Sequence, residues 1–440
     1  MKSHVWRGLI LVTALLSAPF SRPAYPASPA LPAISPAQVP FEQVVGELSS
    51  GDRLTRLRAV QLLRDAAYPE GAVPLAALVT DADDAVQFEA IAAELNIFLA
   101  QPIATRRRVA LIVEKRNLIA AEATFSKGPL ALGPKPVPAE VLEALRKAAR
   151  DSNPRVAVEA LYAFGTLAGE PSGSRRRELL GSIGADLASM VGAASPEFRY
   201  AAVRVIGRIY ERQMGDGDGD ETIGDAMVTV LNDKNRTIRG AAMLALGAMR
   251  YERALSALVD QFQYFRRGEM AEAALSSIAR IGHPAAIPVL AGQLTSKSTA
   301  LKTIAIEGLA RLGDRSRVAG IQAALKGESD ESVVLAGSFS AIALSGGTLD
   351  PVVEALRRPR LAAQARQYLI DLAPGRAGSF TRHSLDPDVA IRSGIADVLG
   401  LAGDVAALPI LEPMRHDHEP QVALAAERAI ARLVSLKSGV

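Results

Sequence analysis

The feature that most constrains the fold of this chain is a helical pattern that recurs about every 30 residues. In segments 238–247, 301–310 and 391–400, an aliphatic residue is followed by Arg or Lys and then by small and aliphatic residues at helical spacing. A fixed period of this length is typical of proteins in which short helical units stack on one another. At 440 residues the chain is longer than one hydrophobic core usually supports, and stacking removes that limit because each unit packs only on its neighbours.

Each unit is predicted to be two antiparallel helices joined by a short polar turn. The apolar residues fall at i, i+3, i+4 and i+7, which places them on one face of a helix. The turn follows the pattern Asp-x-x-Pro-x-Val at 151–156 and 417–422, with a looser copy at 81–86. In this turn Asn153 or Asp84 can cap the free amides of the second helix, and proline is tolerated because no amide hydrogen bond is lost there. The sequence therefore predicts an all-α, right-handed solenoid of about ten to eleven two-helix repeats.

Glycine marks the expected ends of many second helices. Gly282, Gly313 and Gly403 each follow a helical segment, and glycine accepts the left-handed backbone that closes a helix. Small residues inside the second helices should also let neighbouring helices approach closely.

The spacing of the repeats also predicts the domain organisation. It is regular in the C-terminal half and wider in the N-terminal half, which places insertions near 100–138, 169–177 and 213–221 within a solenoid at 41–436. Insertions in repeat proteins map to surface loops, and loops carry function more often than the scaffold does.

The N-terminus has the pattern of a secretory signal. Basic residues precede an apolar stretch at 8–18, which is too short to span a bilayer. We therefore expect a signal peptide at 1–18, with cleavage after Ala18 or as late as Ala30, followed by a Pro/Ala-rich disordered tether at 19–40. An uncleaved membrane anchor is the alternative. The prediction is a periplasmic or extracellular protein with no membrane span after cleavage.

Composition narrows the chemistry and the partners. The chain contains 50 basic and 47 acidic residues, so it has no concentrated basic surface of the kind that binds nucleic acid. It contains no cysteine, which excludes disulfides and lipid attachment through an N-terminal cysteine. We expect a protein or peptide partner, and the sequence does not determine the oligomeric state.

One acidic insertion resembles the start of a calcium-binding loop. Asp216, Asp218 and Asp220 alternate with glycines, and three such carboxylates can converge on one hard cation. The loop departs from the EF-hand pattern because the sixth position is Glu221 instead of glycine. Asp225 is a further candidate ligand, so a calcium site outside the EF-hand class stays open beside the alternative of a solvated loop. No other cofactor is expected.

The sequence shows no pattern of an enzyme. It has no nucleophile elbow, phosphate-binding glycine loop or redox motif, and no carboxylate pair placed for acid–base chemistry. Segment 416–419 offers two histidines and two carboxylates, but its place in the repeat already explains it as a turn between helices.

The turn, the Ala/Leu/Gly-rich second helix and the period together resemble the HEAT-repeat family. The resemblance covers roughly residues 45–436 and is nearest to the short bacterial HEAT-like repeats named after phycobilisome lyases. It implies a right-handed superhelix whose second helices line a concave face, and a role as a protein-binding scaffold. A few members are enzymes, such as deoxyhypusine hydroxylase, which needs several His-Glu pairs for two irons; here the only such pair is His418-Glu419.

We therefore predict an exported binding scaffold that acts through its concave face and inserted loops. A metal-dependent HEAT protein that uses the loop at 216–225, and a purely structural spacer of the cell envelope, are the alternatives. Large or charged residues on the second helices are the candidate partner-binding residues. They are Tyr162, Arg204, Tyr210, Arg239, Lys302, Tyr368 and Arg392.

Overall fold

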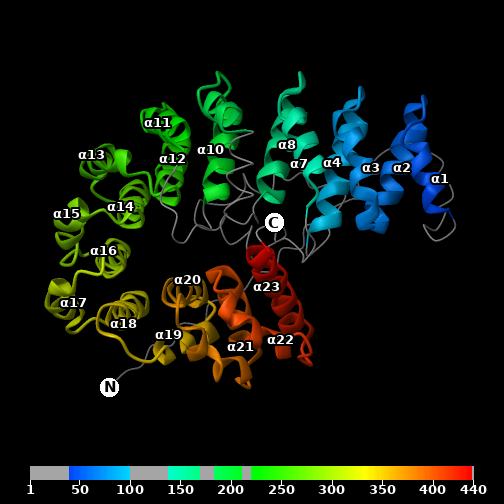
Figure 1. Cartoon of the computed structure of the whole chain (residues 1–440). Helices are drawn as coiled ribbons and strands as arrows, with labels where there is room; N and C mark the ends of the chain where they lie inside the picture. The colour runs from blue at the N-terminus through cyan, green and yellow to red at the C-terminus, as the bar shows by residue number, and fades with distance from the viewer. Residues whose placement is uncertain (1–38, 100–136, 169–182, 211–219, 439–440) are drawn as a thin grey trace, which may run out of the picture. The chain divides into compact units, whose positions relative to one another are not determined.

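The computed structural model describes residues 39–99, 137–168, 183–210 and 220–438 (Figure 1). The chain divides into two units, Met1–Pro40 and Phe41–Val440, and almost all of the first lies outside the described residues. Every secondary-structure element within the described ranges is an α-helix or a 3₁₀-helix. The predicted all-α repeat solenoid is confirmed.

The second helices of the repeats form one continuous layer along the chain (Figure 1). Each of them packs against the second helix of the next repeat, so the core continues from one repeat to the next. They are α2 (Arg53–Ala66), α4 (Asp84–Phe98), α8 (Pro154–Leu167), α10 (Pro196–Tyr210), α12 (Arg236–Ala248), α14 (Glu269–Ile281), α16 (Thr299–Arg311), α18 (Glu331–Ser345), α20 (Ala362–Leu372), α21 (Val389–Ala402) and α23 (Pro420–Ser438).

The first helices are shorter, and several are preceded or replaced by 3₁₀ turns. They are α1 (Phe41–Glu47), η2 (Pro69–Gly71), α3 (Ala72–Ala76), η3 (Ala77–Thr80), α7 (Ala139–Ala148), a helix at 183–191, α11 (Glu221–Val230), η4 (Glu252–Ala254), α13 (Leu255–Phe265), η5 (Pro284–Ala286), α15 (Ile287–Ala291), η6 (Arg315–Arg317), α17 (Val318–Leu325), α19 (Asp350–Val353), η7 (Glu354–Arg357), η8 (Ala377–Phe380), η9 (His383–Leu385), η10 (Val405–Ala407) and α22 (Leu408–Met414).

The polar turns begin the second helices by capping them. Asn153 accepts a hydrogen bond from the Arg155 N–H, and Pro154 occupies the first turn of α8, as predicted. For α4 the prediction of Asp84 as the cap is wrong by one residue. Asp83 adopts the extended backbone of a cap and accepts the amides of Ala85 and Val86, while Asp84 is already helical.

Glycines allow the second helices to pack closely. A Cβ atom at Gly247 would lie 2.7 Å from the Cα of Ser277, and one at Gly400 would lie 2.7 Å from the Cα of Ala429. These distances are shorter than any real contact, so only glycine fits between α12 and α14 or between α21 and α23. Glycines at helix ends have the other predicted role, since Gly282 takes φ 70° and Gly403 takes φ 75°.

Second helices in the middle of the stack are buried on nearly every side. In α8 every residue from Val156 to Leu167 is buried, because α7, α4 and α10 all pack against it. An aromatic side chain on such a helix therefore belongs to the core, whichever way it points.

The three predicted insertions fall almost wholly outside the described residues, as do the predicted signal peptide and nearly all of the predicted tether.

Candidate protein-binding surface

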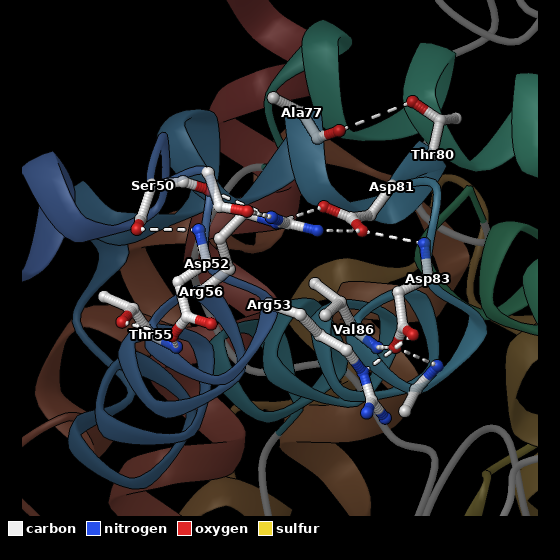
Figure 2. Close-up of polar contacts among 12 residues, drawn as sticks. Ser50, Asp52, Arg53, Thr55, Arg56, Ala77, Thr80, Asp81, Asp83 and Val86 are labelled. Carbon is white, nitrogen blue, oxygen red and sulfur yellow. Dashed lines mark hydrogen bonds and ion pairs between the residues drawn. The ribbon is translucent and has the colours of Figure 1, made fainter.

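One polar contact recurs at the edge of the stack where the second helices begin. In α2, Arg56 lies four residues after the capping Asp52 and extends to Asp81, in the turn before α4 (Figure 2). Arg56 Nε donates to Asp81 Oδ2 at 2.7 Å, and Nη2 donates to Oδ1 at 2.9 Å. Nη1 of Arg56 donates to the carbonyl oxygens of Ser50 and Gly51. We call this contact a rung, because it joins a second helix to the turn of the next repeat.

Two further rungs repeat this geometry. Arg199 donates through Nε and Nη2 to Asp233, at 2.7 and 3.3 Å, and through Nη1 to two carbonyl oxygens of its own turn. Arg392 donates in the same way to Asp417, at 2.7 and 2.9 Å, and to the carbonyls of residues 386 and 387. A planar guanidinium that binds a carboxylate with two hydrogen bonds makes one of the stronger polar contacts in proteins.

Each rung carboxylate also accepts a backbone amide. The N–H groups of Asp83, Asn235 and Glu419 donate to Asp81, Asp233 and Asp417 at 2.8, 2.7 and 2.9 Å. These donors lie two residues after the acid, so each carboxylate bridges a guanidinium and the start of the next second helix. The hydrogen bond from Arg392 lowers the pKa of Asp417 below its ordinary value.

A lysine closes one further rung. Lys302 lies four residues after the capping Ser298, and its Nζ donates to Glu328 Oε2 at 2.6 Å. This contact, together with backbone amides, lowers the pKa of Glu328 to about 2. We refer to these four contacts as the closed rungs.

The rung between α12 and α14 is different, because both of its residues are arginines. Arg239 lies four residues after the capping Asn235, and the turn before α14 places Arg266 where the closed rungs place Asp or Glu. Arg239 Nε is buried without a hydrogen-bond partner. In the described residues its guanidinium makes none of the hydrogen bonds of Arg56, and it lies 5.5 Å from the ring centre of Phe265.

The surroundings of this contact are cationic and aromatic. Arg236 lies 5.7 Å from the Phe265 ring centre, and Tyr264 meets Phe265 edge to face at 4.9 Å. Tyr264 is 77% exposed. Arg266 and Arg267 are exposed, and Arg266 takes a left-handed φ of 59°. We call the resulting surface the open rung. It consists of Arg236, Arg239, Tyr264, Phe265, Arg266 and Arg267.

Acidic groups near the open rung have other positions or partners. Asp233, the turn acid on the preceding side, is hydrogen-bonded to Arg199, and the nearby charge of Arg239 contributes to lowering the pKa of Asp233. Glu269 and Glu272 begin α14, where a negative charge stabilises the helix N-terminus and offsets part of the arginine charge. Exposed tyrosine and arginine are the residue types that most often dominate the energy of protein interfaces.

The tyrosines that the sequence analysis selected as exposed partner contacts are buried, so this prediction is wrong for them. Tyr162, Tyr210 and Tyr368 are each 1% exposed. Tyr368 stacks on Phe339 at 4.4 Å and donates its hydroxyl proton to Glu307. These rings lie in the core because their helices are covered by neighbours on several sides.

The predicted cations divide between two environments. Lys302 and Arg392 are engaged in closed rungs, and Arg392 is 5% exposed, which excludes it as an exposed contact. Arg204 is partly exposed, and its Nε is buried without a hydrogen-bond partner. Arg239 belongs to the open rung. Sequence reasoning missed Tyr264 and Arg266, although residues 266–268 depart visibly from the acidic turn pattern and could have signalled them.

Two of the four predicted calcium ligands are described. Asp220 caps α11 by accepting the amides of Thr222 and Ile223 at 2.8 and 3.1 Å. Asp225 accepts the Tyr251 hydroxyl proton and pairs with Arg253 at 3.5 Å. Asp216 and Asp218 lie outside the described residues, so the calcium site stays a prediction. Within the described ranges, no group of three or more acidic or histidine side chains is arranged to hold a metal ion.

The described part of the chain contains no helix that is both long and apolar enough to cross a membrane.

Comparison with known proteins supports the repeat assignment. A family model described as HEAT repeats matches residues 185–269, which run from the helix at 183–191 through the turn of the open rung. No curated protein sequence matches the chain. The chain is therefore an α-solenoid protein with a segment that matches HEAT repeats.

Several solved structures are similar at low sequence identity. The X-ray structure of YibA from Escherichia coli is 15% identical, with 71% of this chain and 94% of that chain covered and a TM-score of 0.39. The complex of CpcE and CpcF of phycocyanin lyase from a Nostoc species is 17% identical, with coverages of 57% and 93% and a TM-score of 0.34. A designed armadillo repeat protein in complex with the peptide (KR)4 is 18% identical, with coverages of 62% and 99% and a TM-score of 0.35. TM-scores this low assign no function to the chain.

Proposed function

We propose that this protein is a binding scaffold that holds an acidic segment of a partner protein at the open rung. The observation that carries the proposal is the state of Arg239. Arg56, Arg199 and Arg392 occupy the same position in their helices, and each binds a carboxylate with two hydrogen bonds. No carboxylate among the described residues forms a hydrogen bond or ion pair with Arg239, and its Nε is buried without a partner. Asp233 attracts Arg239 electrostatically, but its carboxylate is hydrogen-bonded to Arg199.

The closed rungs define the chemistry that fits this position. In each arginine rung the carboxylate bridges the guanidinium and the N–H of the capping residue, as with Asp417 between Arg392 and Glu419. At the open rung the capping position is Gly268, whose N–H donates no hydrogen bond among the described residues. Arg239 Nε is a buried donor without an acceptor, which costs about 1–3 kcal/mol, and a carboxylate from a partner would recover this cost.

The aromatic side chains supply the second part of the surface. Tyr264 is held against Phe265, so its ring is exposed but supported from one side. A rigid exposed tyrosine gives contact area at a low cost in side-chain entropy. Exposed arginines at 266 and 267 add charge that attracts an acidic segment before contact. The surface therefore suits a segment that carries both a carboxylate and an apolar or aromatic residue.

The proposed role is binding, and we propose no catalytic activity.

We also propose that the chain is exported, which the basic and apolar pattern of its first 18 residues supports. Mass spectrometry of the N-terminus of protein isolated from its cells tests export; an intact segment 1–18 in the cytoplasm would contradict it.

The binding proposal is tested with a fluorescent peptide of four glutamates around one phenylalanine, titrated with the full chain and followed by fluorescence anisotropy. We expect saturable binding that Arg239→Gln weakens at least tenfold, or about 1.4 kcal/mol. Arg155→Gln is the control, because Arg155 is an exposed arginine near the start of another second helix and forms no ion pair among the described residues. It should bind as the unaltered chain does.

Three results would overturn this function. If Arg239→Gln binds the peptide as tightly as the unaltered chain, the open rung is not the site. If oligo(dT) or vesicles of anionic phospholipid bind the full chain at the open rung more tightly than the peptide does at 150 mM salt, the partner is not an acidic protein segment. A chain that binds none of these probes would favour the structural spacer.

A further inference from the structure

A cavity of about 470 Å³ lies at the other end of the second helices, where they terminate. Residues from α14, α16, α18 and α20, and from the turns that follow α12, α14, α16 and α20, line it. Four of the lining residues are arginines, and a single carboxylate, that of Asp371, faces them. The arginines are Arg250, Arg280, Arg311 and Arg376.

The single carboxylate is already engaged. Arg311 Nε donates to Asp371 Oδ2 at 2.8 Å, and Gln367 Nε2 donates to Oδ1 at 3.1 Å. Arg311 also lies 3.4 Å from Glu307 and 5.6 Å from the ring centre of Phe339. Asp371 and Glu307 therefore both pair with Arg311, and neither carboxylate forms an ion pair with Arg250 or Arg376 among the described residues.

The charged form of Arg250 is disfavoured by its surroundings in this cavity. It follows α12 in a left-handed conformation, with φ 52°, and is only partly exposed. Burial lowers the pKa of Arg250, and the neighbouring Arg280 and Arg311 lower it further, against the opposing effect of Asp371. Among the described residues neither Arg250 nor Arg376 forms a side-chain hydrogen bond or ion pair. Guanidinium groups held together in this way are stabilised when an anion lies between them.

We propose that this cavity, which we call the arginine pocket, binds a small organic anion with two or more negative charges. Guanidinium groups bind phosphate and carboxylate oxygens with paired hydrogen bonds. The volume lies within the range of small-molecule sites. Phe339, Leu372 and Pro374 supply an apolar wall, so the ligand has a carbon skeleton as well as charge.

The arginine pocket is rigid and separate from the open rung. Tyr368 stacks on Phe339, which in turn lies beside Arg311, so one wall of the cavity is fixed by core packing. Arg239 and Arg250 lie at opposite ends of α12, roughly 16 Å apart along a helix that rises 1.5 Å per residue. A variant of one site should therefore leave the other intact.

Calorimetric titration of the full chain tests the proposal with two probes at constant ionic strength, glycerol 2-phosphate for the phosphate class and citrate for the carboxylate class. We expect saturable binding of at least one probe, and the tighter of the two identifies the class. Arg250→Gln and Arg376→Gln should each weaken it at least tenfold. Arg315→Gln, which removes an exposed arginine of another turn, and Arg239→Gln should leave it unchanged.

Circular dichroism of each variant without the anion shows whether the fold is retained. The inference is overturned if neither probe saturates, or if Arg315→Gln weakens binding as much as folded Arg250→Gln does. If Arg250→Gln does not fold, folded Arg376→Gln decides in the same way. Because Arg239→Gln is included, failure of the pocket is distinguishable from failure of the binding function.

Discussion

The rung at Arg392 and the rung at Arg239 occupy the same position in their repeats, but only the first binds the next repeat through a carboxylate. Arg392 is 5% exposed, binds Asp417 with two hydrogen bonds and holds the carbonyls of its own turn. Arg239 meets a turn that carries another arginine and exposed aromatic rings. The same position thus joins neighbouring repeats when its partner is an acid, and presents charge to other molecules when it is not.

The largest change in stability is expected when a closed rung is removed. Arg392→Met keeps an unbranched side chain but removes the guanidinium, and so leaves the Asp417 carboxylate largely buried without its partner. Loss of hydrogen bonds to a charged group should lower the free energy of unfolding by about 2–3 kcal/mol. Urea unfolding, with hydrogen exchange of α21 and α23 to localise the effect, measures it. Arg239→Met is the control and should not lower stability, because it removes a buried donor that has no acceptor. Equal losses in the two variants would refute the distinction between open and closed rungs.

A smaller change in stability is expected when a substitution places an acid of the chain itself opposite Arg239. Arg266→Asp places a carboxylate in the turn that faces Arg239 and replaces a left-handed arginine by a residue that tolerates this conformation better. We expect stability to rise by about 1 kcal/mol and acidic-peptide binding to fall at least tenfold. Thermal unfolding and the anisotropy titration measure the two effects. Unchanged peptide affinity in a stabilised variant would show that the carboxylate subsite lies elsewhere.

The smallest effect is the pH dependence of the lysine rung. The pKa of Glu328 is about 2 in the folded chain, against an ordinary value of 4.5. A lowered carboxyl pKa gives stability that is present above pH 4.5 and lost as the pH falls toward 2. The difference in melting temperature between the unaltered chain and Lys302→Met should therefore shrink across this window. Lys297→Met, which removes an exposed lysine of the same turn, should show no such trend. A constant difference from pH 7 to pH 3 would contradict the assignment.

The fold could be predicted from the sequence because its signals are local. Helical spacing, the caps at Asn153 and Pro154, and the glycines that end helices all act within a few residues. The single-residue error at Asp83 and Asp84 has the same origin, since adjacent aspartates offer the same cap chemistry.

The candidate site could be predicted only in part, because its partners are distant in the chain. Arg392 and Asp417 were each noted in the sequence, but their pairing across 25 residues depends on how consecutive repeats stack. The burial of Tyr162 depends on helices that cover α8 from several sides. Arg239 was selected as one cation among several, and only the position of Arg266 opposite it shows why it differs.

The division of each rung between two repeats also bears on how such a chain can change in evolution. A repeat such as that of α21 carries an acid, Asp386, before its second helix and a cation, Arg392, within it. Duplicating a whole repeat of this kind places the cation of the first copy beside the acid of the second, so the new junction forms a closed rung. The repeat of α14 has the opposite signs, with Arg266 before the helix and Glu272 within it. It therefore cannot replace a repeat such as that of α21 without placing like charges beside each other, and its position in the order of repeats is constrained.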